Sequence, residues 1–201
     1  MLNHPARAFW IVATATLLLD QLTKSVVRIL WHSQSALLPL DAAVARFVGP
    51  AYDPYESVPV FGEWFMFTHV RNTGAAFGLL PGYRPIFIAT SMIVLVVVAA
   101  YWRRARPANW LVVIPLGLIA GGAVGNLIDR AVVGRVTDFL HFAVIDFPVF
   151  NVADSAIFIG VGILIAWLLF GPQPEDEQRS EPDAVEPTDS SALGSGEQGQ
   201  Q

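Results

Sequence analysis

The sequence has no cysteine and few charged residues. The absence of cysteine from its 201 residues excludes disulfide bonds, thiolate zinc sites and cysteine nucleophiles. Charged residues make up only 14% of the chain, against about 25% of a typical soluble domain, whereas hydrophobic residues make up 54%. This combination predicts an integral membrane protein before any individual segment is considered.

The net charge of −5 comes from the C-terminal part of the chain. Residues 172–201 contain eight acidic side chains and one basic side chain, which leaves nine acidic and eleven basic side chains in residues 1–171. Residues 172–201 are also rich in Pro, Ser and Gly and poor in aliphatic residues, so we expect a disordered acidic tail. Residues 1–171 then form a single, slightly basic membrane domain.

Four apolar stretches approach or reach the length of about 20 residues that a membrane-spanning helix needs. The first contains Asp20 and Lys24, and no convincing small-residue cleavage site follows it. We therefore interpret it as a retained helix and not as a signal peptide. The predicted spans are approximately residues 8–30, 85–102, 108–128 and 152–170.

Basic residues predict the orientation of these spans. The link between the second and third spans carries Arg103, Arg104 and Arg106. Because cytoplasmic links of membrane proteins are enriched in Lys and Arg, this link is predicted to face the cytoplasm. With four spans, both termini are then cytoplasmic, and the links 31–84 and 129–151 face outward.

The outer link 31–84 is too long for a simple loop. Its second half is rich in aromatic and aliphatic residues whose side chains alternate along the chain, which is the pattern of β-strands. We predict a small β-sheet, or cradle, on the outer membrane surface, built from about residues 58–78 and 136–147. The predicted fold class is an all-α membrane protein of four transmembrane helices with this extracytoplasmic sheet. The segment 32–57 has no pattern that assigns it.

Polar residues within membrane spans are costly and are therefore candidates for function. Here they gather at one depth, near the outer ends of the spans, whereas the cytoplasmic halves have almost none. Asp138 lies in the outer link between the third and fourth spans, among apolar neighbours that favour an inward orientation. The others are Asp20 and Lys24 in the first span, Asn126, Asp129 and Arg130 at the end of the third, and Asn151 and Asp154 at the start of the fourth.

Several of these features also have ordinary structural explanations. Asp20 and Lys24 can form a helical ion pair with Lys24 extending to the interface, or they can brace a site or meet a lipid headgroup. Asn151 is a good helix N-cap, and Asp154 suits the first turn of a helix. A stripe of small residues that allows close helix packing is formed by Gly117, Gly121 and Gly125.

Asp138 and Asp154 flank a short outer link, so their side chains could converge. Two adjacent carboxyls cannot both ionise cheaply, and one then keeps a proton while the other acts as a base. Such a pair activates water and protonates a leaving amine without a metal. Zinc-peptidase and serine-hydrolase sites fit worse, because H-E-x-x-H and G-x-S-x-G are absent. From these residues alone, a proton-coupled transporter that uses the same acidic side chains is an alternative to a peptidase.

Five blocks of this sequence, in this order, resemble lipoprotein signal peptidase (signal peptidase II). The resemblance covers about residues 8–171, and the five blocks together are far more specific than any one of them. The blocks are Asp20–Lys24, Arg71–Gly78, Gly121–Arg130, Val136–Phe139 and Phe150–Ala156.

The resemblance implies a bacterial inner-membrane aspartic endopeptidase with Asp138 and Asp154 as the catalytic pair. Its substrate would be a diacylglyceryl-modified prolipoprotein, cut just before the lipidated cysteine. Nothing in the sequence demands more than a monomer, and we expect no metal, cofactor or nucleic-acid partner. Asp129, Gly121 and Gly125 would have structural roles. Substrate-binding or supporting roles would belong to Asp20, Lys24, Asn72, Gly74, Asn126, Arg130 and Asn151.

Overall fold

The computed structural model of the chain describes residues 4–31, 57–74, 83–145 and 147–171. Residues 1–169 form one compact unit, to which the following description applies, and residues 170–201 form a second. The predicted acidic tail and nearly all of the segment 32–57 lie outside the described residues, so what was expected of them stays a prediction.

The described residues contain four α-helices and one π-helical turn. They are α1 (His4–Leu30), α3 (Arg84–Ala105), α4 (Trp110–Ile128), the π-helix η2 (Asp129–Val133) and α5 (Val152–Phe170). Three of these helices, α3, α4 with η2, and α5, are long and apolar enough to cross a membrane. Helix α1 has 27 residues, but polar residues between Asp20 and Lys24 reduce its hydropathy. Three of the four predicted spans thus meet this criterion within the described residues, and a span formed by α1 stays a prediction.

The predicted small sheet is present and is antiparallel. Its strands are β1 (Ser57–Phe61), β2 (Phe65–Asn72) and β3 (Val136–Phe142), in the order β1-β2-β3. A turn divides the first predicted β region into a hairpin, and Gly62 in this turn has a φ of +55°, a conformation that glycine adopts readily. Residues 75–78 and 146 of the predicted β regions lie outside the described residues.

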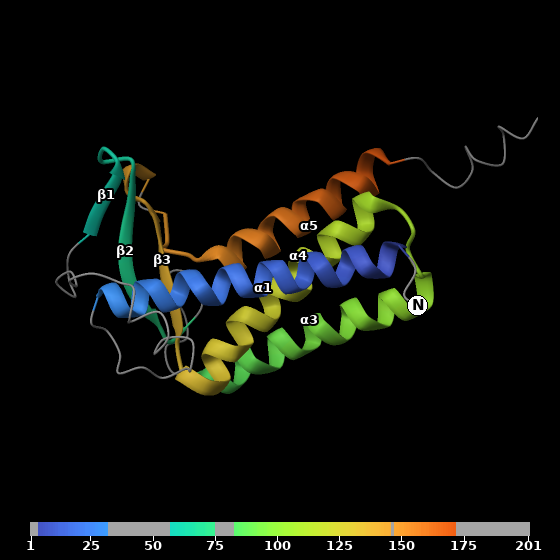
Figure 1. Ribbon diagram of the computed structural model, residues 1–201, viewed down its shortest axis with the longest axis horizontal. Coiled ribbons are helices and arrows are strands. Elements are labelled where there is room, and N and C mark those ends of the chain that lie inside the picture. Colours follow the sequence, from blue (N-terminus) through green and yellow to red (C-terminus); the bar gives the residue numbers. More distant parts are fainter. Residues whose placement is uncertain (1–3, 32–56, 75–82, 146, 172–201) are drawn as a thin grey trace, which may run out of the picture. The chain divides into compact units, whose positions relative to one another are not determined.

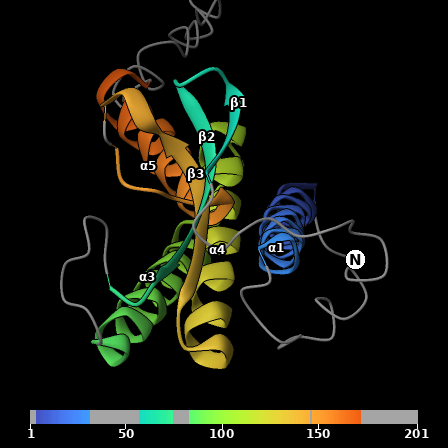
Figure 2. The ribbon, with the colours of Figure 1, turned by 90° about the vertical axis from the view of Figure 1, so that its left-hand side faces the viewer.

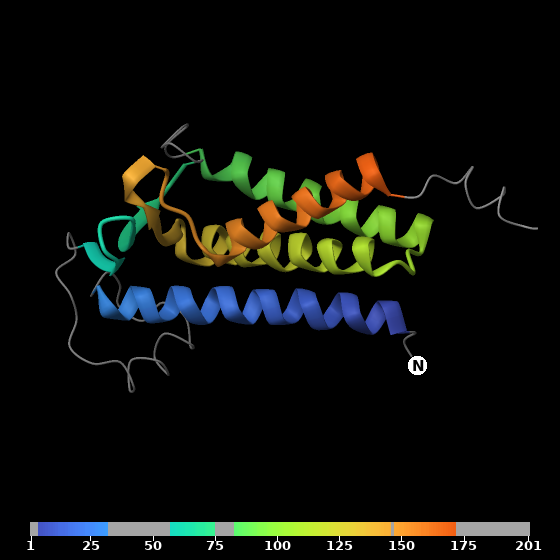
Figure 3. The same cartoon turned by 90° about the horizontal axis from the view of Figure 1, so that it is seen from above.

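The sheet lies at one end of the helices, where α1 and α4 end and α3 and α5 begin (Figure 1). Helix α4 lies between α1 on one side and α3 and α5 on the other (Figures 2 and 3). The polar residues at these helix ends are thereby brought next to the sheet, and α4 can contact the helices on both sides.

Glycines on α4 let two neighbouring helices approach closely. A Cβ at Gly121 would lie 2.5 Å from the backbone oxygen of Ala13 in α1, and a Cβ at Gly122 would lie 2.5 Å from the backbone oxygen of Ala153 in α5. Gly125 lies directly against a carboxylate of α1. Two faces of α4 are therefore in backbone contact with their neighbours, which positions the start of α5 relative to α1.

Alanine in place of Gly121 should lower the free energy of unfolding by about 1–3 kcal/mol, because the added methyl group meets a backbone oxygen that cannot rotate away. Gly162→Ala is the matched control, since no atom lies within 4 Å of a Cβ at that position. The control should be neutral or slightly stabilising, because alanine favours helix. Thermal unfolding in detergent measures both, and equal losses would contradict the packing argument.

The two faces of β3 have different neighbours. Phe139 packs against Trp31 at the end of α1, and Thr137 Oγ1 accepts a hydrogen bond from Arg28 of the same helix at 3.4 Å. Successive side chains of a strand point to opposite faces of its sheet, so Asp138 points away from this end of α1. The alternation therefore separates a packing face from the face that carries the candidate catalytic acid.

Candidate active site

Asp138 lies on β3, and its side chain is almost completely buried. The residue is 1% exposed. Its Oδ1 accepts a hydrogen bond from Asn151 Nδ2 at 2.6 Å, and its Oδ2 accepts one from Asn72 Nδ2 at 2.8 Å. Asn72 ends β2 and Asn151 directly precedes α5. The end of β2, the strand β3 and the start of α5 therefore meet at this carboxyl group.

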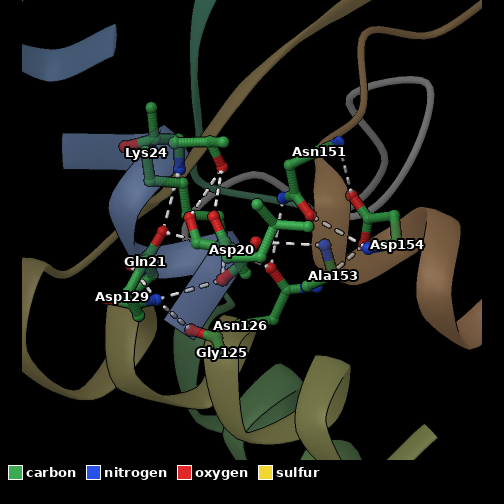
Figure 4. Close-up of polar contacts among 12 residues, drawn as sticks. Asp20, Gln21, Lys24, Gly125, Asn126, Asp129, Asn151, Ala153 and Asp154 are labelled. Atoms are coloured by element: carbon green, nitrogen blue, oxygen red, sulfur yellow. Dashed lines mark hydrogen bonds and ion pairs between the residues drawn. The ribbon is translucent and has the colours of Figure 1, made fainter. Parts of the chain in front are cut away.

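Asp154 lies in the first turn of α5. Its Oδ1 accepts a hydrogen bond from Asn126 Nδ2 of α4 at 2.8 Å. Asn151 Oδ1 accepts from the backbone N of Asp154 at 2.9 Å, and Asp154 Oδ2 accepts from the backbone N of Asn151 at 3.2 Å (Figure 4). This reciprocal pair is a capping box, which satisfies two backbone N–H groups at the start of a helix. The capping explanation therefore holds alongside any role in chemistry.

The side-chain amides that hold the two carboxyls have fixed orientations. Asn72 Oδ1 accepts from the backbone N of Gly74 at 2.8 Å, and Asn126 Oδ1 accepts from Lys24 Nζ at 2.9 Å. Asn151 Oδ1 is occupied by the capping hydrogen bond. An amide whose oxygen faces a donor must present its NH₂ group to the other side. All three asparagines consequently donate to the candidate catalytic acids.

The surroundings of Asp138 favour its protonated form. Burial, and secondly the charge of the nearby Asp154, raise the pKa of Asp138 from 3.8 to about 7. The hydrogen bonds from Asn72 and Asn151 oppose this shift, because they stabilise the ionised carboxylate, but their effect is smaller. Near neutral pH, Asp138 therefore holds a proton for a large part of the time.

Next to the two acids lies a buried cluster of opposite charges. Lys24 Nζ lies 2.9 Å from Asp20 Oδ2 and 3.3 Å from Asp129 Oδ2, and Arg28 lies 3.7 Å from Asp129 Oδ1. All four side chains are 0% exposed. Gln21 donates hydrogen bonds to both acids (Figure 4). Two acidic and two basic side chains thus lie against one another away from solvent, which is the pairing that buried ionisable groups require.

This cluster touches the site at two points. Lys24 holds the oxygen of Asn126, which in turn donates to Asp154. Asp20 Oδ1 accepts a hydrogen bond from the backbone N of Ala153 at 3.0 Å. This N–H belongs to the first turn of α5, where backbone donors have no partner within the helix. Helix α1 thereby supports the start of α5, although its one acidic residue, Asp20, does not line the cavity described below.

The structure corrects two interpretations of Asp20 and Lys24. Lys24 does not extend to the membrane interface, and neither residue can meet a lipid headgroup, because both are 0% exposed. Their ion pair is real, but it belongs to the larger cluster. Arg28 was not among the predicted site residues, although it lies four residues after Lys24 on the same helix face. Extending the i, i+4 spacing by one turn would have found it.

Asp138 and Asp154 both line one cavity of about 640 Å³. Asn72 and Arg130 add polar groups to its wall, and most of the remaining wall is apolar. The guanidinium carbon of Arg130 lies 5.2 Å from the ring centroid of Phe87 in α3, which is a cation–π contact. The apolar lining includes Phe142, Ile145, Phe147, Phe150, Phe158 and Ile159.

The polar groups of this cavity suit proton transfer. A carboxyl with a pKa of about 7 can both donate and accept a proton near neutral pH, and a second carboxyl lies beside it. Within the described residues, no group of three or more His, Cys, Asp or Glu side chains is placed to hold a metal ion. The expectation that no metal or cofactor takes part stays a prediction.

The chain matches known proteins along most of its length. The family described as Signal peptidase (SPase) II matches residues 12–170. A lipoprotein signal peptidase of Desulfitobacterium hafniense is 41% identical over 148 residues, which cover 73% of this chain and 97% of that protein. A lipoprotein signal peptidase of Brevibacillus brevis is 47% identical over 131 residues, which cover 65% of this chain and 88% of that protein.

A solved structure also resembles the chain. It is described as a bacterial membrane enzyme determined by the in meso method at 2.3 Å resolution, and it matches with a TM-score of 0.63 at 28% identity. The match covers 87% of this chain and 92% of that chain. Together with the apolar helices, these relatives confirm the predicted resemblance and a multi-pass membrane protein. The chain belongs to the signal peptidase II family.

Proposed function

We propose that the chain is a membrane-embedded aspartic endopeptidase that removes the signal peptide from prolipoproteins, with Asp138 and Asp154 as its catalytic pair. The observation that supports the proposal most directly is that both carboxyls reach the wall of one largely apolar cavity. The transporter alternative is not favoured, because the matched relatives are signal peptidases. The polar groups also gather at one end of the helices and do not continue along them.

The two acids have different roles in the proposed reaction. Asp154 takes a proton from a water molecule, whose oxygen attacks the carbonyl carbon of the scissile bond, while Asp138 gives its proton to the carbonyl oxygen. The C–N bond then breaks as the leaving nitrogen receives the proton held by Asp154, and Asp138 recovers a proton from the hydroxyl group. The raised pKa of Asp138 supports its assignment as the acid.

The amides and the cavity wall support the remaining roles. Asn72, Asn126 and Asn151 hold the carboxyls in place through their NH₂ groups. Arg130 places a positive charge at the same cavity, where it can meet polar atoms of the substrate. The apolar wall suits the acyl chains of a diacylglyceryl-modified cysteine, and cleavage would occur just before that cysteine. We propose a monomer with no nucleic-acid partner.

Four membrane spans are part of the same proposal. Asp20, Lys24 and Arg28 of α1 are buried inside the protein, whereas its exposed side chains include Ile11, Leu18 and Leu19. A helix of 27 residues is long enough to cross a bilayer, and this one would present an apolar surface to lipid. With four spans and a cytoplasmic link at Arg103–Arg106, both termini are cytoplasmic and the sheet and cavity lie at the outer leaflet of the inner membrane.

The substrate assignment predicts a dependence on lipid. The purified chain in detergent should cleave a diacylglyceryl-modified prolipoprotein just before the modified cysteine and leave the unmodified prolipoprotein intact, because the apolar cavity wall has no partner in the latter. Mass spectrometry of the products after equal incubation measures both. Equal cleavage of the two substrates would contradict the lipid specificity, and cleavage of neither would contradict the proposed function.

Cleavage should also depend on pH in a defined direction. The acid Asp138 must carry its proton, so kcat/KM should fall as the pH rises above about 7, the pKa of that group. A series of initial rates from mildly acidic to mildly alkaline pH measures the profile. Unfolding controls at each pH exclude loss of the folded enzyme. A rate that rises steadily with pH across this range would show that Asp138 is not the proton donor.

A further inference from the structure

The end of the sheet carries large apolar side chains that are open to the surroundings. Phe61, Trp64 and Ile145 are 72%, 70% and 71% exposed. We define the hairpin patch as these residues together with other exposed apolar residues of the same region. The complete patch is Phe61, Trp64, Phe142, Val144, Ile145 and Phe147. Contiguous apolar surface of this kind marks a site of interaction with a partner or a membrane.

The hairpin patch continues into the cavity. The backbone N of Ala143 donates to the backbone oxygen of Trp64 at 3.1 Å, which joins the β1–β2 turn to the end of β3. The ring of Phe65 lies 5.2 Å from that of Phe142, and the ring of Phe142 lies 5.7 Å from that of Phe150. Phe150 lines the cavity together with the exposed Phe158 of α5. One apolar surface therefore runs from the hairpin turn, past the cavity, to a candidate membrane span.

We propose that the hairpin patch inserts into the lipid leaflet beside the sheet, at the depth of the glycerol groups and upper acyl chains. Its continuity with the apolar surface of α5 favours bulk membrane lipid as the occupant, because the bilayer that covers α5 extends over the same surface. Tryptophan is also enriched at this depth of membrane proteins. The proposal rests on the outward placement of the sheet in the proposed function, and not on the catalytic roles.

Charge sets the depth of the insertion. Glu63 lies in the turn between Gly62 and Trp64 and is exposed. An ionised carboxylate is costly in the hydrocarbon core, so Glu63 keeps the hairpin turn at the interface and prevents deeper insertion. An inserted patch would hold the cavity at the level of the acyl chains. A lipidated substrate could then enter sideways from the leaflet without leaving the bilayer.

Site-specific labelling tests the insertion, and a chain without cysteine allows it directly. Single variants Phe61→Cys, Trp64→Cys and Ile145→Cys would carry an environment-sensitive fluorophore in phosphatidylcholine–phosphatidylglycerol vesicles. Ser57→Cys, at the far end of β1, is the aqueous control, and the 62% exposed Ile93→Cys in α3 is the lipid control. Quenching by nitroxide lipids labelled at shallow or deep positions, and by aqueous iodide, is measured for each.

All three patch labels should be quenched several-fold more strongly by the shallow nitroxide lipid than Ser57→Cys is, and less by the deep lipid than by the shallow one. Iodide should reach Ser57→Cys and not the patch. Patch labels that iodide quenches as strongly as the control would overturn the proposal, and so would protection from both quenchers, which would mean that protein covers the patch. Inactive variants remain informative, since the readout is depth. If the patch labels report insertion but the variants of Asp138 and Asp154 remain active, the result would contradict the proposed catalytic pair and not the insertion.

Discussion

Asparagine in place of Asp138 or Asp154 should reduce cleavage of a lipid-modified prolipoprotein by about 10²–10⁴-fold or more, because each change removes a group that moves a proton in the reaction. The change is nearly isosteric, so the strands and helices that carry the two residues should stay in place. Each variant is assayed separately, in detergent and in vesicles, by the rate of signal-peptide release.

The control for this experiment is Glu63→Gln, which removes a carboxylate of the exposed hairpin turn and should leave the rate in detergent unchanged. Because the two acids act as one unit, the double variant should be scarcely less active than either single variant. Near-normal turnover in either single variant would rule out the catalytic pair.

Stability measurements separate the loss of chemistry from the loss of the fold. In the folded chain the pKa of Asp138 is raised from 3.8 to about 7, so the folded state binds this proton more tightly than the unfolded state. The wild-type chain should therefore lose stability as the pH rises from about 4 to about 7. Asp138→Asn lacks this loss and should unfold at a higher temperature than the wild type above pH 7. A variant that is inactive but more stable than the wild type would have lost catalysis while keeping its fold.

Methionine in place of Lys24 should have the second largest effect, a loss of about 3–5 kcal/mol in the free energy of unfolding. The substitution leaves the buried acids Asp20 and Asp129 without the cation that lies 2.9 Å and 3.3 Å from them. It also removes the shorter of two hydrogen bonds to the oxygen of Asn126, which leaves only the one from Asn151 Nδ2 at 3.2 Å to orient the amide that donates to Asp154. Activity should consequently fall in the fraction that remains folded.

A double variant allows the role of the cluster to be tested even if Lys24→Met folds poorly. Asp20→Asn combined with Lys24→Met removes one charge of each sign, and Asp129 keeps Arg28 as its partner. The double variant should recover part of the lost stability, because a buried charge without a partner costs more than a missing pair. Thermal unfolding of the wild type, the single variant and the double variant forms the comparison. A single variant as stable as the wild type would show that the cluster does not support the fold.

Different parts of this protein were predictable from sequence to different degrees. The helices and the sheet follow from local patterns: long apolar runs in α3, α4 and α5, and alternation in β2. Asp138 and Asp154 could be placed near one another because a short link joins them. The contact of Asp138 with Asn72, 66 residues earlier, depends on how β2 pairs with β3, which no local pattern specifies.

The full set of partners of Lys24 could not be predicted from local sequence patterns either. Its spacing from Asp20 predicts an ion pair, and the pair is present. Whether it faces lipid, water or protein depends on which helix packs against α1. The glycines of α4 predict a close neighbour but do not identify it, and the structure shows that α1 packs there with the ion pair inward. The residues of the site could thus be named from sequence more readily than their contacts.

The fixed asparagine amides have a consequence for inhibition and for the emergence of resistance. A compound that binds the two carboxyls and their amide donors would contact groups that are each already engaged with Gly74, Lys24 or the start of α5. A mutation that weakens the compound at Asn72, Asn126 or Asn151 would also release one of these partners and so impair the enzyme. Escape by substitution should therefore concentrate on the apolar wall of the cavity, and compounds that depend least on that wall should retain their potency longest.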